Sequence, residues 1–511
     1  MFEDSWHWNE HAEREFDEIL RQPNTDVAEI MKALRSFLGQ NDMMAYLTMM
    51  ANRLLELHRV LKSTGSLYLH CDPTASHYLK IVLDGVFGPT LFKSEINWRR
   101  SSAHNDAKQG RKQPGNVRDV LFFYTKSNKW TWNWIYTPYT EEYLASEYRH
   151  KTAAARYFKE SDLTANKEGG DVSFEWRVKR EIGERWEADL TDEYKSPVEG
   201  CEYKGVFPYQ GRYWAYSKQN IIDFAVKGQL QHRETGMPRL IQYADEMPGV
   251  PLQNDWQDIR PALGEAYLGY DTQKPVALLE RIITASSNEG DVILDPFCGC
   301  GTAVHAAQKL KRKWIGIDIT CLAIGLIEKR LKHAFGEDFV FEVHGTPTDM
   351  ESARDLAARD KYQFQWWAVT LVEAQPYQGR KKGADGGIDG LKFFHDVNVK
   401  DAKKIVVSVK GGGLKADDLR ALNHVREREK AEIAFLISLA EPTGKMRADA
   451  ASAGFYTDGA GRKFARVQLL TIDGLLSGRE RGEHPDYVPD VNYKKARREK
   501  GHLGKQGEFF E

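Results

Sequence analysis

The sequence predicts an α/β protein with a mostly parallel sheet and a second, smaller α/β domain towards the C-terminus. Apolar runs of strand length alternate with helical patterns between residues 54 and 127, and again between 273 and 335. Such alternation is typical of helices that connect parallel strands. A separate series of strand and helix patterns follows residue 350. These observations predict two α/β regions in one chain.

The composition is that of an ordinary soluble protein of several domains. The chain has 511 residues and a net charge of −2, so its overall charge does not indicate nucleic-acid binding. We expect no membrane span, because no apolar run is long enough. The five cysteines are dispersed, which favours a reducing cytoplasm over a disulfide framework. Cys298 and Cys300 have no second pair that would complete a metal site, and small residues in a tight loop are the simpler interpretation.

The first region contains two predicted strands, Ser66–Asp72 and Asp119–Ser127, with helical patterns before and after the first of them. Residues 128–262 are rich in Tyr, Trp and charged residues and have weak periodicity. We interpret them as an inserted, partly irregular domain. Helical patterns then occupy residues 273–286 and 321–335, on either side of a glycine-containing loop.

The second region extends from Met350 to about Arg479. Its pattern predicts a helix, two strands, a helix and two further strands, at residues 362–374, 388–394, 403–410, 416–431, 432–439 and 465–472. We expect Trp366 and Trp367 to pack in its core. Residues 480–511 form a basic tail that we expect to fray.

The stretch "LDPFCGCGT" joins an apolar run to a helical segment that begins near Thr302. Gly299 and Gly301 lack a Cβ, so the backbone can approach a ligand closely, and the helix start offers free N–H groups. Asp318 ends the next apolar run, where an acid can hold ribose hydroxyls. The third glycine of a dinucleotide loop is absent, with Val304 in its place. A purely structural turn is the alternative, but the combination favours an adenosine-type ligand.

The motif "LDPFCGCGTAVHAAQKLKRKWIGIDI", the upstream "TQKPVALLERII" and the strands "GSLYLHCD" and "DVLFFYTKS" resemble amino DNA methyltransferases of the beta class. The resemblance implies a Rossmann-like, S-adenosylmethionine-dependent domain in permuted order. Its catalytic half would be residues 1–127, its target recognition domain 128–262 and its cofactor-binding half 263–345. The residues it implies for the cofactor are Asp295 at the start of the loop, Phe297, Gly299, Gly301 and Thr302 along it, Asp318 at the ribose, and Gln273, Lys274 and Pro275 at the methionine end.

The family's catalytic tetrapeptide, Asp-Pro-Pro-Tyr/Phe, does not occur in this sequence. In the family it binds the target amino group and stacks on the flipped base. We therefore expect the methyltransferase domain to be N-terminally incomplete, with about one strand absent. Truncation, a misassigned start, or a segment supplied by another chain would each account for this.

A basic loop lies between the two first-region strands and could follow DNA phosphates. Its cationic residues are Arg99, Arg100, Lys108, Arg111, Lys112 and Arg118. A solvated surface loop is the alternative. The resemblance favours phosphate contact and implies double-stranded DNA as the partner.

The second region places Asp389 at the start of one predicted strand and Lys410 at the end of the next. An acid and a lysine so placed could hold Mg²⁺ and a water near a phosphate. With the surrounding pattern they resemble Mrr-like restriction endonucleases of the PD-(D/E)XK type, for residues 350–479. Asp389 would be the metal ligand, and Asp389 and Lys410 the catalytic residues. Ser408 occupies the position of the usual second ligand, so Asp385 could complete the site or activity could be weak.

Together these patterns predict a site-specific DNA methyltransferase with a nuclease-like domain, acting in restriction–modification or phage defence. Adenine N6 is favoured as the acceptor over cytosine N4. The alternatives are a DNA-binding protein that senses the cofactor without transferring methyl groups, and an endonuclease that uses the methyltransferase fold for recognition. We expect the protein in the cytoplasm, as a homodimer or with a chain that supplies the missing segment.

Overall fold

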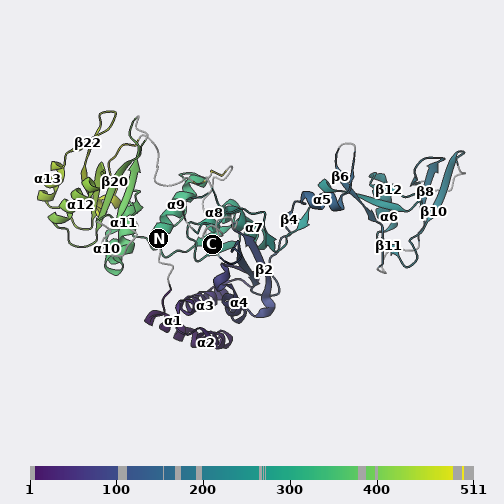
Figure 1. Cartoon of the computed structure of the whole chain (residues 1–511), viewed down its shortest axis with the longest axis horizontal. Helices are drawn as coiled ribbons and strands as arrows, with labels where there is room; N and C mark the ends of the chain where they lie inside the picture. Colours follow the sequence, from purple (N-terminus) through teal and green to yellow (C-terminus); the bar gives the residue numbers. More distant parts are fainter. Residues whose placement is uncertain are drawn as a thin grey trace. The chain divides into compact units, whose positions relative to one another are not determined.

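The computed structural model describes residues 6–101, 112–152, 155–166, 174–190, 198–263, 267–268, 270, 272–377, 387–397, 401–486, 496 and 498–499. The chain forms two compact units, Met1–Asn133 with Asn254–Glu511, and Trp134–Gln253 (Figure 1). Within the described ranges, no helix combines the length and apolar character needed to cross a membrane.

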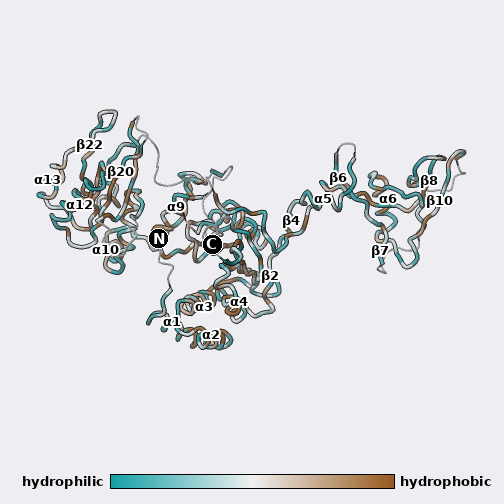
Figure 2. The backbone as a smooth tube through the Cα atoms, in the orientation of Figure 1, coloured by the Kyte–Doolittle hydropathy of each residue, from teal (hydrophilic) through white to brown (hydrophobic). Residues whose placement is uncertain are grey.

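Four helices form the N-terminal layer: α1 (Glu10–Leu20), α2 (Thr25–Leu38), α3 (Asp42–Val60) and α4 (Pro73–Phe87). Each begins after an Asn or Asp whose side chain accepts N–H bonds from the first turn. Hydrophobic and hydrophilic stretches alternate along these helices (Figure 2). Their apolar faces pack on one another and on Phe122 and Tyr124 of the neighbouring sheet.

That sheet has the order β1-β3-β2-β15, with β1 (Ser66–Cys71), β2 (Phe92–Arg99), β3 (Arg118–Thr125) and β15 (Asp255–Trp256). The short helix η1 (Pro89–Leu91) precedes β2. The expectation of a parallel sheet is wrong here, because β3 is antiparallel to both β1 and β2. Between β2 and β3 the described residues contain no crossover helix of the kind that parallel neighbours need.

The parallel arrangement is found where the chain returns after the inserted unit. Strands β16 (Val292–Asp295) and β17 (Lys313–Gly316) pair in parallel. Helix α8 (Thr302–Lys309) connects them. Helices α7 (Val276–Ser286) and α9 (Cys321–Phe335) complete this part, and the core between them includes Val304, Trp314 and Leu331.

The second unit consists of short strands and two helices. Its elements are β4 (Tyr136–Thr137), α5 (Glu141–Glu147), β5 (His150–Lys151), β6 (Tyr157–Asp162), β7 (Thr164–Ala165), β8 (Trp176–Glu181), β9 (Glu187–Ala188), β10 (Cys201–Val206), β11 (Tyr213–Trp214), α6 (Lys218–Val226), β12 (Leu230–His232), β13 (Pro238–Tyr243), η4 (Ala244–Glu246) and β14 (Val250–Pro251). Buried Trp176, Trp186 and Trp214 lie in its core. Aromatic bulk thus compensates for the weak periodicity of the segment.

The C-terminal region has a five-stranded mixed sheet of order β18-β19-β20-β21-β24. Its elements are α10 (Met350–Arg359), α11 (Lys361–Thr370), β18 (Gln375–Pro376), β19 (Gly390–Phe394), β20 (Lys403–Lys410), α12 (Ala416–Arg428), β21 (Ile433–Ser438), α13 (Gly444–Ser452), β22 (Phe455–Thr457), β23 (Lys463–Ala465), β24 (Val467–Thr471) and α14 (Ile472–Leu476). Helices α10 and α11 cover one face and α12 and α13 the other (Figure 1). Trp367 is buried on the first face, as expected.

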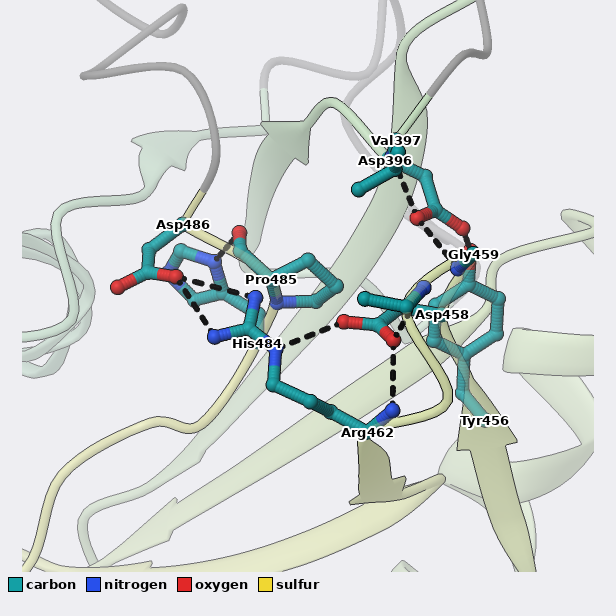
Figure 3. A network of polar contacts seen from close by, with 10 residues as sticks. Asp396, Val397, Tyr456, Asp458, Gly459, Arg462, His484, Pro485 and Asp486 are labelled. Carbon is teal, nitrogen blue, oxygen red and sulfur yellow. Dashed lines mark hydrogen bonds and ion pairs between the residues drawn. The ribbon is translucent and has the colours of Figure 1, made fainter.

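A polar network holds the β22–β23 hairpin of this region (Figure 3). Asp396 accepts hydrogen bonds from the Tyr456 hydroxyl and, at 2.9 Å, from the Gly459 N–H. Buried Asp458 accepts from the Arg462 Nε at 2.9 Å, and Arg462 also pairs with Asp486 at 3.2 Å. These carboxylates are occupied by donors of the hairpin, so their role is structural.

Candidate functional site

The glycine loop turns sharply between β16 and α8. Asp295 ends the strand, and its Oδ1 accepts the Phe297 N–H at 3.1 Å. The Gly301 N–H donates to the Cys298 carbonyl at 2.7 Å. Gly299 and Gly301 have φ angles of +50° and +72°, the left-handed region that glycine occupies without strain. A Cβ on Gly301 would lie 2.7 Å from Ile327 Cγ1, so the loop has no room for a side chain there.

The carboxylate of Asp318, just beyond β17, fastens this loop. Its Oδ2 accepts the Gly299 N–H at 3.0 Å. Its Oδ1 accepts the Thr320 N–H at 3.0 Å and the Thr320 hydroxyl at 2.9 Å. A carboxylate has about four acceptor positions, so Asp318 retains capacity for one further donor. The acid therefore lies beside the loop, at the carboxyl end of the sheet.

Helix α8 begins at the end of the glycine loop. Gly301 is the N-cap of α8 and supplies no side-chain acceptor, so the first N–H groups keep their capacity for a ligand. The Thr302 hydroxyl donates to the Lys274 carbonyl at 3.2 Å, which joins the loop to the segment before α7. Burial lowers the pKa of Lys274.

The remaining predicted residues lie in that upstream segment. Gln273 Oε1 accepts the Leu268 N–H at 2.7 Å, and Pro275 is the N-cap of α7. Hydrogen bonds thus join Gly299 to Asp318 and Thr302 to Lys274, and the glycine loop connects Gly299 to Thr302. Gln273 and Pro275 flank Lys274 in the sequence, at the start of α7.

Three neighbouring residues were missed by the sequence argument. The Tyr270 ring lies so close to Gly299 that a Cβ there would be 3.2 Å from it. His70, on β1, bonds to the carboxylate of Asp119, on β3, at 2.8 Å. Burial lowers the pKa of His70, and the charge of Lys274 contributes in the same direction. The pattern "LYLHCD" contained a signal, since His70 is a polar residue within an apolar strand.

The structure brings together part of the predicted nuclease-like site in the C-terminal region. Asp389 accepts the Ser408 hydroxyl at 3.2 Å and the Val409 N–H at 2.6 Å. Ser408 and Lys410 share one face of β20, because side chains alternate along a strand. Lys410 pairs with Asp418, at the start of α12, at 3.2 Å. Asp418 was not predicted from the sequence.

These residues fit a magnesium ion poorly. Asp389 supplies one carboxylate, Ser408 a neutral oxygen, and Asp418 is paired with Lys410. Among the residues that the structure describes, no three His, Cys, Asp or Glu side chains are grouped as a metal site. Asp385 lies outside the described residues.

The basic loop is only partly described. Arg99, Arg100, Lys112 and Arg118 are exposed, whereas Lys108 and Arg111 lie outside the described residues. Arg100 Nε also pairs with buried Asp119 at 2.9 Å, which anchors one end of the loop.

A family model described as DNA methylase, of the N6/N4 type, matches residues 30–329, more than half of the chain. The chain belongs to this DNA methylase family. The match includes the glycine loop, Asp318 and the whole inserted unit.

Among its relatives, the type II methyltransferase M.EcaI of Enterobacter cloacae is 31% identical over 62% of this chain and 65% of its own length. The Mod subunit of the type III enzyme StyLTI of Salmonella typhimurium is 24% identical over 60% of this chain and 43% of its own length. The chain therefore covers less than two thirds of the length of either relative. In structure, the M1.HpyAVI–SAM complex aligns with 55% of this chain and 81% of its own, at 13% identity and a TM-score of 0.27.

The crowding by Ile327 makes a side chain at Gly301 destabilising. Gly301→Ala should lower the free energy of unfolding by about 1–3 kcal/mol more than Gly290→Ala. Both glycines have positive φ, at +72° and +84°, but a Cβ meets Ile327 only at Gly301 and open space at Gly290. Denaturant unfolding of both variants measures the difference. Equal losses would show that the loop can move aside.

Proposed function

We propose that this DNA methylase forms the cofactor-binding and DNA-binding parts of a site-specific methyltransferase. It would transfer a methyl group from S-adenosylmethionine to an exocyclic amino group of double-stranded DNA, with adenine N6 favoured. Restriction–modification or phage defence, in the cytoplasm, is the setting we infer. The observation that carries the proposal is the glycine loop fastened to Asp318 in a chain of the DNA methylase family.

The residues present fit the cofactor. Gly299 and Gly301 leave the backbone bare, and the uncapped start of α8 offers N–H groups. Asp318 would accept hydrogen bonds from the ribose, with Asp295, Phe297 and Thr302 bordering the ligand. The segment Gln273–Pro275 would hold its methionine end. Bound there, S-adenosylmethionine supplies the methyl group.

The tetrapeptide Asp-Pro-Pro-Tyr/Phe, which would bind the methyl acceptor, is absent from the sequence. One edge of β1 and one edge of β16 are unpaired among the described residues, so a strand that carries the tetrapeptide could pair there. In the described residues β1 pairs only with β3, and β16 only with β17. Strands of a doubly wound sheet are normally covered on both faces. Val292 and Ile315 are exposed, and Ile317 is 50% exposed.

We infer that a strand with this motif, from outside the printed sequence, pairs with these edges. A second, different chain that carries the motif is one source of such a strand, whereas a second copy of this chain lacks the motif as well. Without such a strand, the alternative is a catalytically incomplete DNA-binding or endonuclease protein that uses the methyltransferase fold for recognition. The absent tetrapeptide is the observation that favours this alternative.

DNA would be recognised by the inserted unit and the basic loop. The aromatic side chains exposed on the unit include Trp134, Phe207 and Tyr209, which can contact bases or sugars. Exposed Arg99 and Lys112 can follow phosphates. We propose residues 128–262 as the target recognition domain.

For residues 350–479 we propose an Mrr-like, PD-(D/E)XK-type domain. The supporting observation is the contact of Asp389 with Ser408, two residues before Lys410 on the same face of one strand. Since the described donors fit magnesium poorly, nuclease activity is expected to be weak.

Asp318→Ala should weaken S-adenosylmethionine binding by about 1.5–3 kcal/mol, because a charged acceptor is lost. The loop also loses its bond to Gly299. Isothermal calorimetry measures the affinity, and Asp338→Ala, which changes an exposed acid after α9, is the control. The same affinity for Asp318→Ala and the parent chain would refute the ribose assignment.

The printed chain alone should transfer tritiated methyl groups to DNA poorly. A version extended by a segment with the Asp-Pro-Pro-Tyr/Phe motif should be active, since that segment binds the target amino group. The assay compares the two proteins at equal concentration. Robust turnover by the printed chain without a partner would mean that other residues do the catalysis.

Any magnesium-dependent DNA cleavage should disappear in both Asp389→Ala and Lys410→Ala while DNA binding persists. The first change removes a carboxylate, and the second removes a charge near the attacked phosphate. Lys445→Ala, an exposed lysine of the same domain, is the control. Cleavage that neither active-site change affects would end the nuclease proposal.

A further inference from the structure

A buried arginine fastens the glycine loop from behind. Arg330, on α9, is 3% exposed. Its Nη1 donates to the Cys300 carbonyl at 2.9 Å and to the Thr302 hydroxyl at 3.1 Å. Both acceptors belong to the loop and the first turn of α8. The position of Arg330 therefore determines where the loop backbone lies.

Arg330 is in turn held by a buried histidine. Its Nε donates to His305 Nδ1 at 3.3 Å, and His305 is 3% exposed. Burial, followed by the charge of Arg330, lowers the pKa of His305 to about 4, so the ring is neutral at pH 7. A neutral ring that accepts at Nδ1 carries its proton on Nε2 and donates there.

The acceptor of that proton is Glu499, from the C-terminal tail. Its Oε1 lies 3.2 Å from His305 Nε2, and its Oε2 lies 3.4 Å from Lys309 Nζ. The Glu499 N–H donates to the Ala334 carbonyl at 2.8 Å, and Ala496 packs against the same core. The expectation that the tail frays is wrong for these residues, because a backbone bond, an apolar contact and a carboxylate hold them.

Along the contacts from Arg330 through His305, Glu499 is the first negatively charged residue. Within the described part of the protein, Arg330 donates hydrogen bonds to Cys300, Thr302 and His305 and to no carboxylate. A buried cation is costly unless it is compensated. By accepting from His305 Nε2, Glu499 stabilises the tautomer whose Nδ1 accepts from Arg330.

We propose that Glu499 is a positioning residue for the cofactor loop: acting through His305 and Arg330, this tail residue holds Cys300 and Thr302 in the geometry that binds S-adenosylmethionine. This inference rests on the proposed function for the identity of the ligand. The tail, at the far end of the sequence, is thereby part of the cofactor-binding half.

The test compares Glu499→Ala, Glu499→Gln and Glu280→Gln in the full chain. Glu280 pairs with the same Lys309, at 2.8 Å, whereas the polar partners of the His305 ring in the described part of the chain are Glu499 and Arg330, so Glu280 is the matched control. Calorimetry gives the affinity for S-adenosylmethionine, and hydrogen–deuterium exchange without cofactor gives the mobility of residues 296–304.

Glu499→Ala should weaken cofactor binding about 5-fold or more and speed exchange in the loop. Glu499→Gln should recover most of both, because its amide oxygen accepts from His305 Nε2. Glu280→Gln should match the parent chain. Parent-like binding and exchange in Glu499→Ala would overturn the proposal, and so would an equal loss in Glu280→Gln. If the parent chain binds no S-adenosylmethionine, the proposed function fails, and loop exchange alone decides the positioning role.

Discussion

The hydrogen bond from the Gly299 N–H to the Asp318 carboxylate is the interaction on which the candidate site depends. It joins the loop after β16 to the residues after β17, so the carboxyl ends of both strands contribute residues to the candidate site. The left-handed glycines permit the turn, and the acid fixes it. This bond holds the loop that leads into α8 next to the Asp318 carboxylate.

The site is braced from two sides. Towards the upstream segment, Thr302 bonds to the Lys274 carbonyl. Towards the interior, Arg330, His305 and Glu499 form a continuous chain of contacts to the tail. Rigid support of this kind keeps a binding loop in its productive geometry. Among the described residues, β1 pairs only with β3 and β16 only with β17, so the other edge of each of these strands has no comparable support.

The sequence predicted the elements that have strong local signals. The loop, the helix at Cys321–Phe335 and the strand Lys403–Lys410 were found because periodicity and glycine placement are local properties. The antiparallel position of β3 was not predicted, because strand order is decided by long-range pairing. Glu499 was assigned to a fraying tail for the same reason, as its partners His305 and Lys309 are distant in sequence. Asp418 was missed because only the fold brings α12 to the end of β20.

A crystal structure of the chain with S-adenosylmethionine tests the central claim most directly. The account predicts the ribose within hydrogen-bonding distance of the Asp318 carboxylate, with the ligand against Gly299, Gly301 and the start of α8. The methionine end should lie towards Gln273–Pro275. A ligand bound elsewhere, or a ribose that does not approach Asp318, would contradict it.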